Sequence, residues 1–232
     1  MYKRILLKIS GEVLAGAKGF GMNDEMIMEV CRSIKACRDL GVEVAIVVGG
    51  GNFWRGRTSG DMNRVKADHI GMLATVMNAI ALSDGLERLG VPAVVMTAAE
   101  MKKFAETFYQ DKAIDCLQSG KVVIFGGGTG NPYFSTDTGA ALRAIEIGAD
   151  ILMKATNVDG VYDKDPNKYA DAVKYDRVTP QEVLEKGIKV MDSTAFALCK
   201  DNNMPILVFN LEQKNSIIDA IHQKEIGTLV SD

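Results

Sequence analysis

Residues 121–137 read KVVIFGGGTGNPYFSTD, and this stretch decides the fold class. Its apolar first part, Lys121–Phe125, is typical of a buried strand, and a glycine-rich loop follows directly. Thr136 or Asp137 is then expected to cap a helix that runs to Ile147. A strand that leads through a loop into a helix is the repeating unit of an α/β sheet.

The same unit recurs along the chain. Further apolar runs of strand length are Arg4–Ile9, Val42–Val48, Ala93–Met96, Ile151–Lys154 and Ile206–Phe209, with Gly227–Val230 expected as a last strand at the sheet edge. Helix-period stretches are Asp24–Leu40, Ala67–Leu89 and a helix that begins with a capping box at Thr179–Glu182. This alternation predicts an α/β fold, a mainly parallel open sheet sandwiched by helices in three α/β/α layers.

Composition narrows the class of protein. The chain has 232 residues, 47% hydrophobic and 25% charged, with no linker or internal repeat, so one domain over residues 1–232 is expected. A net charge of −3 offers no basic surface for nucleic acid or membrane. Because no apolar run approaches ~18 residues and no signal-peptide pattern follows Met1, the sequence predicts a cytoplasmic protein.

Two glycine loops follow predicted strands and carry cations beside them. Lys8 ends the first strand and Ser10-Gly11 follows, which can aim an ammonium and backbone N–H groups at a phosphate. The second strand ends in Gly49-Gly50-Gly51, and Arg55 can bind a phosphate with two hydrogen bonds. Either loop taken separately is also compatible with an ordinary surface turn.

Two later loops supply groups that suit a nucleoside. Residues 126–137 combine three glycines, hydroxyl and amide groups and the aromatic pair Tyr133-Phe134. A base can pack on such a ring while polar groups read its edge. After the strand at 151–154, Lys154 again stands at a strand end, and Tyr162 and Asp165 follow as candidate nucleoside contacts.

Common catalytic motifs are missing from the sequence. There is no G-x-x-x-x-G-K-[ST] and no H-E-x-x-H, and G-x-G-x-x-G fails because the sixth position from Gly126 is Asn131. His222 is expected on a solvated helix, and His69 is interpreted as a structural or ligand-orienting residue rather than a base. No metal site is predicted, and reduced, buried thiols are expected for the four cysteines, which are Cys31, Cys37, Cys116 and Cys199.

Taken in order, these motifs resemble the amino-acid-kinase family. Within it, the stretches GTGNPYFSTD at 128–137 and RVKADHIGMLATVM at 64–77 are similar to the branch that phosphorylates UMP. The resemblance implies transfer of the γ-phosphoryl group of ATP to UMP, a reversible step of pyrimidine nucleotide synthesis. It also implies that residues 1–150 form a UMP-binding lobe and residues 151–232 an ATP-binding lobe.

The resemblance further implies roles for individual residues. The catalytic set is Lys8, Asp137 and Lys154, in which Asp137 orients a lysine or the metal. Contacts to ATP are implied for Lys8, Ile9, Ser10, Gly11, Gly51, Arg55, Thr156, Asn157, Tyr162 and Asp165. Contacts to UMP are implied for Gly50, Asp68, Thr129, Gly130, Asn131, Pro132, Tyr133, Phe134, Ser135 and Thr136. A segment associated with activation by GTP matches Gly16, Ala17, Lys18, Gly19, Phe20 and Gly21.

The family likeness extends to cofactor and regulation. It implies Mg²⁺ bound with ATP, activation by GTP, inhibition by UTP and a homohexamer. Position 157 is Asn where several family members carry Lys, so the contact to ATP at 156 or 157 stays open. Two other functions also stay open: a kinase that phosphorylates a carboxylate or carbamate, and a nucleotide-binding regulatory protein without turnover.

Overall fold

The computed structural model describes residues 1–55, 60–188, 191–211, 213 and 215–231. Within these residues, nine strands form one sheet in the order β4-β3-β5-β2-β1-β6-β10-β11-β9. The strands are β1 (Arg4–Ile9), β2 (Glu43–Val48), β3 (Ala93–Thr97), β4 (Glu106–Thr107), β5 (Val122–Gly126), β6 (Ile151–Thr156), β9 (Arg177–Val178), β10 (Ile206–Asn210) and β11 (Thr228–Val230). All neighbours pair in parallel except β10 and β11, which are antiparallel. A separate antiparallel ribbon joins β7 (Val161–Tyr162) to β8 (Lys174–Tyr175).

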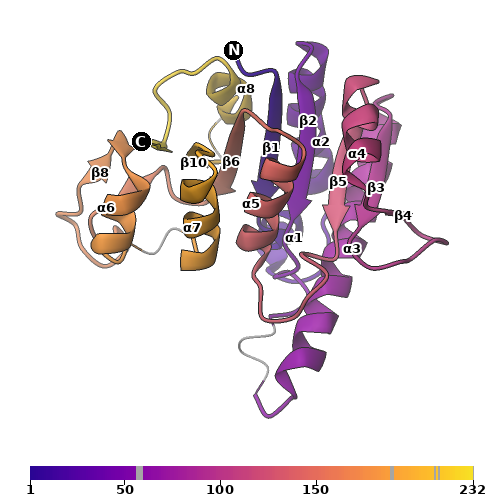
Figure 1. Cartoon of the computed structure of the whole chain (residues 1–232), viewed down its shortest axis with the longest axis horizontal. Coiled ribbons are helices and arrows are strands. Elements are labelled where there is room, and N and C mark those ends of the chain that lie inside the picture. Colours follow the sequence, from indigo (N-terminus) through magenta and orange to yellow (C-terminus); the bar gives the residue numbers. More distant parts are fainter. Residues whose placement is uncertain (56–59, 189–190, 212, 214, 232) are drawn as a thin grey trace.

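Helices cover both faces of the sheet, as Figure 1 shows. The helices are α1 (Gly11–Ala15), α2 (Asp24–Asp39), α3 (Arg64–Arg88), α4 (Gln110–Gln118), α5 (Thr136–Glu146), α6 (Pro180–Glu185), α7 (Ser193–Asp201) and α8 (Ser216–Ile221), with a 3-10 turn at Gly16–Lys18. One apolar core contains residues of α2, α3 and α8, and the other contains residues of α4, α5 and α7. The three-layer α/β/α prediction is therefore confirmed.

Alternation along the central strands feeds both cores. In β1, Ile5 and Leu7 belong to the core under α2 and α3, whereas Leu6 belongs to the core under α5 and α7. Side chains of successive strand residues point to opposite faces of a sheet, so Lys8 lies on the same face as Leu6. The pattern that builds the core thus also decides which helix layer Lys8 faces.

The first strand, β1, divides the sheet into two halves that the chain builds one after the other. From β1 the chain builds β2, β3, β4 and β5 on one side, and then places β6, β10, β11 and β9 on the other. The β1/β6 boundary is therefore the topological switch point of the sheet. In open α/β sheets, ligands bind at such a point, beyond the carboxyl ends of the strands.

Three details of the predicted elements need correction. Thr228–Val230 is the last strand but not an edge, because β9 pairs with its outer side. The cap of α5 is Ser135, whose hydroxyl accepts from the N–H groups of Asp137 and Thr138. Helix α3 begins at Arg64, three residues before the expected start, because the Asn63 side chain accepts a hydrogen bond from Lys66 N.

Some elements were not foreseen, and one buried position was misjudged. The short strands β4, β7, β8 and β9 carry only two residues each, too few for an apolar pattern to be recognised. Cys31, Cys37 and Cys199 are buried as expected, whereas Cys116 is only partly buried. None of the helices in the described residues has the length and apolar character needed to span a membrane.

Candidate active site

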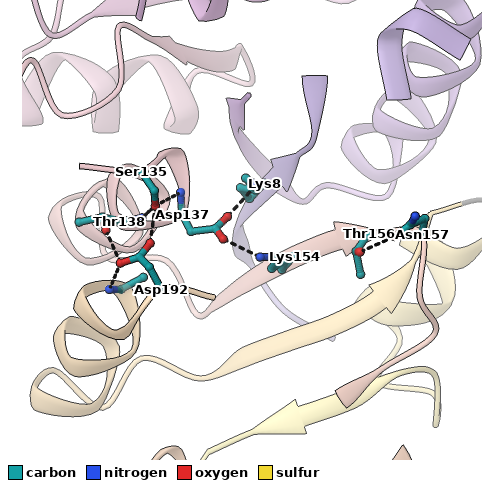
Figure 2. Close-up of polar contacts among 9 residues, drawn as sticks. Lys8, Ser135, Asp137, Thr138, Lys154, Thr156, Asn157 and Asp192 are labelled. Atoms are coloured by element: carbon teal, nitrogen blue, oxygen red, sulfur yellow. Dashed lines mark hydrogen bonds and ion pairs between the residues drawn. The ribbon is translucent and has the colours of Figure 1, made fainter. Parts of the chain in front are cut away.

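Two lysines lie side by side where the sheet changes direction. The β1/β6 register pairs Lys8 with Lys154, so the two residues are direct neighbours on adjacent parallel strands. Both stand near the carboxyl ends of their strands, and both point toward the α5 layer (Figure 2). Two ammonium groups so close to each other would repel unless an anion lay between them.

The carboxylate of Asp137 lies between the two ammonium groups. Lys8 Nζ is 2.7 Å from Asp137 Oδ1, and Lys154 Nζ is 2.6 Å from Asp137 Oδ2 (Figure 2). The three side chains are between 11% and 14% exposed. Asp137 therefore orients both lysines at once, with one oxygen for each.

Burial and charge oppose each other in this triad. Burial alone would raise the pKa of the Asp137 carboxyl, but the ammonium groups of Lys8 and Lys154 prevail and hold its pKa below the ordinary value. Burial lowers the pKa of Lys154, and the neighbouring Lys8 charge adds to that shift, while Asp137 counteracts it. The carboxylate is thus held ionised, and the site carries a net positive charge when both lysines are protonated.

The position of Asp137 depends on how α5 begins. Ser135 caps the helix, and its hydroxyl also donates to Asp192 Oδ2. Thr138 Oγ1 donates to the other oxygen, Asp192 Oδ1, at 2.8 Å. Asp192 is itself the N-cap of α7, where it accepts from Ala195 N at 3.1 Å. The Asp192 carboxylate therefore joins the start of α7 to the first turn of α5 (Figure 2). It does so through Ser135 and Thr138, which flank Asp137 in the sequence.

The glycine loops lie against each other and leave no room for a side chain at Gly11 or Gly50. A Cβ on Gly11 would come within 2.6 Å of both Asn52 Oδ1 and Gly49 O. A Cβ on Gly50 would come within 2.7 Å of Gly71 O in α3. We call Ser10–Gly11 and Gly49–Gly51 together the phosphate cradle. Close backbone approach therefore requires glycine at Gly11 and Gly50, whereas a Cβ on Gly51 would meet its neighbours only at 3.6 Å.

A cavity of about 420 Å³ lies beside Lys8 and the phosphate cradle, and Asp137 and Lys154 are not part of its lining. Its size is in the range of small-molecule sites. Predicted ATP residues that line it are Lys8, Ser10, Gly11, Gly51 and Arg55. Predicted UMP residues that line it are Gly50, Asp68, Thr129, Asn131, Phe134, Ser135 and Thr136. The sequence reasoning missed other lining residues, among them Trp54, Arg64, Met72 and Thr75.

The remaining predicted residues lie outside this lining. Thr156 and Asn157 contact each other at 3.2 Å at the end of β6, away from the triad (Figure 2). Tyr162 donates its hydroxyl proton to Asp159 at 2.5 Å, and Asp165 accepts from Asn167 N at 3.0 Å. These residues are therefore not brought together with the phosphate cradle in one cavity.

Ile9 differs from the prediction in a specific way. Its side chain is fully buried in the core under α2 and α3. Its carbonyl accepts from Gly49 N at 2.8 Å. Its register opposite Val48 in the parallel β1/β2 pair also places its N–H in the sheet ladder, so Ile9 is a core residue that joins β1 to the phosphate cradle.

Asp68 organises one wall of the cavity. Its Oδ2 accepts from the backbone N–H of Tyr133 at 2.7 Å, and Arg64 Nε approaches both carboxylate oxygens at 2.8 and 2.9 Å. Tyr133 has a φ of 72°, which is unusual for a non-glycine residue, and the Arg64 guanidinium lies 5.3 Å from its ring centroid. α3 thus holds the loop at 129–136 through a charged hydrogen-bond network.

Several other candidates from the sequence have exposed side chains. Arg55 forms an ion pair with Glu12, and both side chains are more than half exposed. His69 is exposed on α3 and does not line the cavity, whereas His222 is exposed at the end of α8, as expected. In segment 16–21, Phe20 is 67% exposed and its ring packs edge-to-face on Phe53 with centroids 5.8 Å apart.

Some contributing residues carried only weak sequence signals. Asp192 precedes Ser193-Thr194-Ala195, which is a recognisable helix start, but nothing in that pattern points to α5. Asn52 and Asn78 are buried and bonded to each other, and an isolated Asn inside an apolar helix is ordinarily interpreted as a surface residue.

Comparison with known proteins agrees with this geometry. The model of the amino acid kinase family matches residues 3–210. Uridylate kinase of Limosilactobacillus reuteri is 53% identical over 232 residues, covering 99% of this chain and 97% of that protein. The solved UMP kinase from Bacillus anthracis has a TM-score of 0.97 at 36% identity, covering 100% of this chain and 96% of its own. That from Ureaplasma parvum has a TM-score of 0.94 at 38% identity, covering 100% of both chains. Because the family model spans most of the chain and the similarity runs along its whole length, the chain belongs to the amino acid kinase family.

Proposed function

We propose that this chain is a UMP kinase, which transfers the γ-phosphoryl group of ATP to UMP and gives UDP and ADP. The observation that carries the proposal is the Lys8–Asp137–Lys154 triad at the switch point of the sheet, in which Lys8 lines a cavity that residues of the loop at 129–136 also line. The reaction is reversible and belongs to pyrimidine nucleotide synthesis.

The chemistry requires positive charge and alignment but no general base. The acceptor is a phosphate monoester whose second pKa is about 6, so at neutral pH it is mostly a dianion and already nucleophilic. The difficulty lies in bringing two polyanions into line. Lys8 and Lys154, held by Asp137, and the N–H groups of the phosphate cradle are the fixed positive groups that stabilise the transferring phosphoryl group.

The two substrates approach this centre from different sides. In our proposal UMP occupies the cavity wall formed by Gly50, Asp68 and the loop at 129–136. The ATP phosphates lie on Ser10, Gly11 and Gly51, with Arg55 released from Glu12 to join them. Thr156, Asn157, Tyr162 and Asp165 receive the nucleoside of ATP. Residues 1–150 then act as the UMP lobe and residues 151–232 as the ATP lobe of one continuous sheet.

Mg²⁺ enters with ATP. Within the described residues there is no group of three or more His, Cys, Asp or Glu side chains placed to hold a metal ion. Mg²⁺ does not need such a group, because it is commonly bound through substrate phosphates and water with one or two carboxylates. When bound, the ion neutralises charge on the phosphates, and Asp137 is the carboxylate that lies nearest the two lysines.

Helix α3 supports the proposal of a homo-oligomer, in our view a hexamer. Ile70, Leu73, Met77 and Ile80 are between 38% and 51% exposed and follow one another at spacings of three and four. Such spacing places them on one face of the helix. A contiguous exposed apolar face of this kind is typical of a protein–protein interface, and the occupant proposed here is a second copy of the chain.

Regulation and location complete the proposal. GTP activates the enzyme through the segment Gly16–Gly21, and UTP inhibits it. The protein acts in the cytoplasm on soluble nucleotides and requires neither membrane nor nucleic acid.

A coupled ADP-release assay with a panel of acceptors tests the function. We expect turnover with UMP and a much lower kcat/KM for CMP and dUMP, because unpaired polar groups in a site built for one base and sugar reject analogues strongly. Equal kcat/KM for UMP and CMP would contradict the assignment. Turnover with glutamate, aspartate or carbamate instead of UMP would favour the carboxylate or carbamate kinase, and ATP binding without any ADP release would favour the regulatory protein.

A further inference from the structure

A buried pair of amide side chains lies behind the phosphate cradle. Asn52 is 1% exposed and Asn78 is fully buried. Asn52 Nδ2 donates to Asn78 Oδ1 at 3.0 Å, and Asn78 Nδ2 donates to Asn52 Oδ1 at 2.7 Å. Asn52 follows directly on Gly51, and Asn78 lies in the middle of α3. The pair therefore joins the cradle loop to a helix by reciprocal hydrogen bonds.

The second N–H of each amide reaches a backbone carbonyl. Asn78 Nδ2 donates to Gly49 O at 2.7 Å, and Asn52 Nδ2 donates to Gly21 O at 2.7 Å. Gly21 N in turn donates to Asn52 O at 3.0 Å. All four N–H donors of the pair are thus used: three join the loop at 49–52 to α3, and one joins that loop to residue 21.

The same contacts set the position of one half of the cradle against the other. Gly49 N donates to Ile9 O at 2.8 Å, so Gly49 is held by β1 on one side and by Asn78 on the other. Asn52 Oδ1 lies 2.6 Å from the position that a Cβ on Gly11 would take. A shift of the amide pair would therefore move Gly49–Gly51 relative to Gly11 and to Lys8.

We propose that Asn52 and Asn78 are positioning residues for phosphoryl transfer, which hold Gly49–Gly51 in line with Gly11 and Lys8 without touching either substrate. The inference rests on the proposed kinase function. Apolar side chains can replace the bonds between the two amides at little cost in folding free energy, because both partners are removed together. What an apolar pair cannot do is pull Gly49 O and Gly21 O to fixed distances. The amides are therefore proposed to align Gly49–Gly51.

The first test compares folding with turnover in one double variant, Asn52→Leu/Asn78→Leu. Because Gly49 O and Gly21 O lose these donors, we expect a folded variant with a moderately lowered Tm, while kcat for UMP and ATP, measured well below that Tm, falls roughly 10²-fold, the loss that a misplacement of about 1 Å produces. The fall in kcat should exceed the change in KM for UMP. Gln118→Leu, at an exposed side chain at the end of α4, is the control and should leave Tm and kcat unchanged.

The second test uses Asn78→Asp and does not depend on the double variant. Burial raises the pKa of a carboxyl group, so this variant takes up a proton as the pH falls from about 8 to about 6. The protonated form can donate its O–H to Gly49 O, whereas the ionised form repels that carbonyl. We therefore expect the ratio of variant to wild-type kcat to rise severalfold toward low pH. Because UMP titrates equally in both reactions, its effect on kcat cancels in this ratio.

The outcomes separate this inference from the proposed function. Absence of wild-type turnover with UMP would refute the kinase function first. With an active wild type, a folded double variant that keeps wild-type kcat overturns the positioning role. If the double variant does not fold, the pH series on Asn78→Asp decides, and a flat ratio overturns the role.

Discussion

Lys8 and Lys154 occupy neighbouring positions in the β1/β6 register, where two cations would ordinarily repel. Asp137 makes the arrangement stable in the free protein because it offers one carboxylate oxygen to each ammonium. The triad keeps a net positive charge when both lysines are protonated, which is the charge that a phosphoryl group in transfer requires. At the residue scale, the site is thus prepared for an anion before any substrate binds.

Replacement of Lys8 tests charge stabilisation directly. Comparable cations in other phosphoryl-transfer enzymes contribute about 10³–10⁵ in kcat. We expect Lys8→Met to lose at least roughly 10²-fold in kcat with a much smaller change in KM for UMP, because the cation acts mainly in the transition state. Lys8→Arg should also be poor, since a planar guanidinium does not replace a compact ammonium beside Asp137.

Steady-state kinetics on folded variants measure this effect, with His69→Gln as the comparison. His69 is exposed and outside the cavity lining, and the proposed chemistry needs no base, so its replacement should cost far less. Near-normal kcat in Lys8→Met, or a larger loss in His69→Gln, would contradict the mechanism.

The lowered pKa of Lys154 predicts a specific pH profile. Its pKa lies below the ordinary value of 10.5, mainly because the side chain is buried. As pH rises through that lowered pKa, Lys154 loses its proton and its charge, so kcat/KM should fall at a lower pH than an ordinary lysine would dictate. A profile of kcat/KM against pH measures this limb for the free enzyme.

Two variants show whether Lys154 causes the fall of kcat/KM at high pH. Arginine stays protonated across the accessible range, so Lys154→Arg should shift the limb to higher pH whatever its absolute rate. Lys168→Arg, at a side chain that is 74% exposed, should leave the profile unchanged. An identical limb in wild type and Lys154→Arg would rule out Lys154 as its source.

At the scale of elements, short contacts at helix starts connect segments that bear different parts of the site. Asp192 at the start of α7 accepts from Ser135 and Thr138 at the start of α5. Residue 21 is bonded to Asn52 beside the phosphate cradle. The second link is notable because it joins the segment proposed to respond to GTP to a loop of the active site by backbone and side-chain hydrogen bonds.

Phe20 provides a test of that segment. Its ring is exposed and packs on Phe53 outside the cavity lining, so Phe20→Ala should leave basal turnover largely intact while reducing any activation by GTP. Initial rates with and without GTP, at several UMP concentrations, measure both quantities. A collapse of basal turnover would instead show that residues 16–21 serve the active site directly.

At the scale of the whole molecule, α3 faces two ways. Its inner residues, such as Ala79, Leu82 and Leu86, are fully buried in the core, and Asp68 and Asn78 of the same helix hold the two loops of the site. Its outer apolar face is exposed in the single chain. The first turns of α3 also extend beyond the sheet, at the bottom of Figure 1. A partner on this face would therefore act on a helix that positions the active site.

Light scattering at micromolar concentration tests the assembly, with a hexamer expected for the wild type. Leu73→Glu places a charge in the middle of the exposed α3 face and should shift the mass toward smaller species, because a buried unpaired charge is costly. Leu40→Glu, at an apolar side chain of similar exposure beyond α2, is the matched control. A monomeric wild type would refute the assembly, and equal effects of the two substitutions would place the interface elsewhere.

Much of this protein is determined locally by the sequence. Continuous apolar runs place β1, β2, β5, β6 and β10 within a residue or two, because the length of a run and its β-branched content can be recognised within a short stretch of sequence. The glycine loops after strands, and the lysines at strand ends, are likewise legible in the sequence. Local signals also explain the capping box at Thr179, whose two hydrogen bonds are made within four residues.

Tertiary structure alone decided how these pieces meet. Lys8 and Lys154 become neighbours only because β6 pairs with β1 rather than with β5, which precedes it in the chain. Asp137 reaches both lysines because α5 packs over that junction, and Asn52 meets Asn78 because α3 packs against the cradle loop. Pairing between distant strands and helices depends on the total packing of two apolar cores, and no short stretch of sequence carries that information.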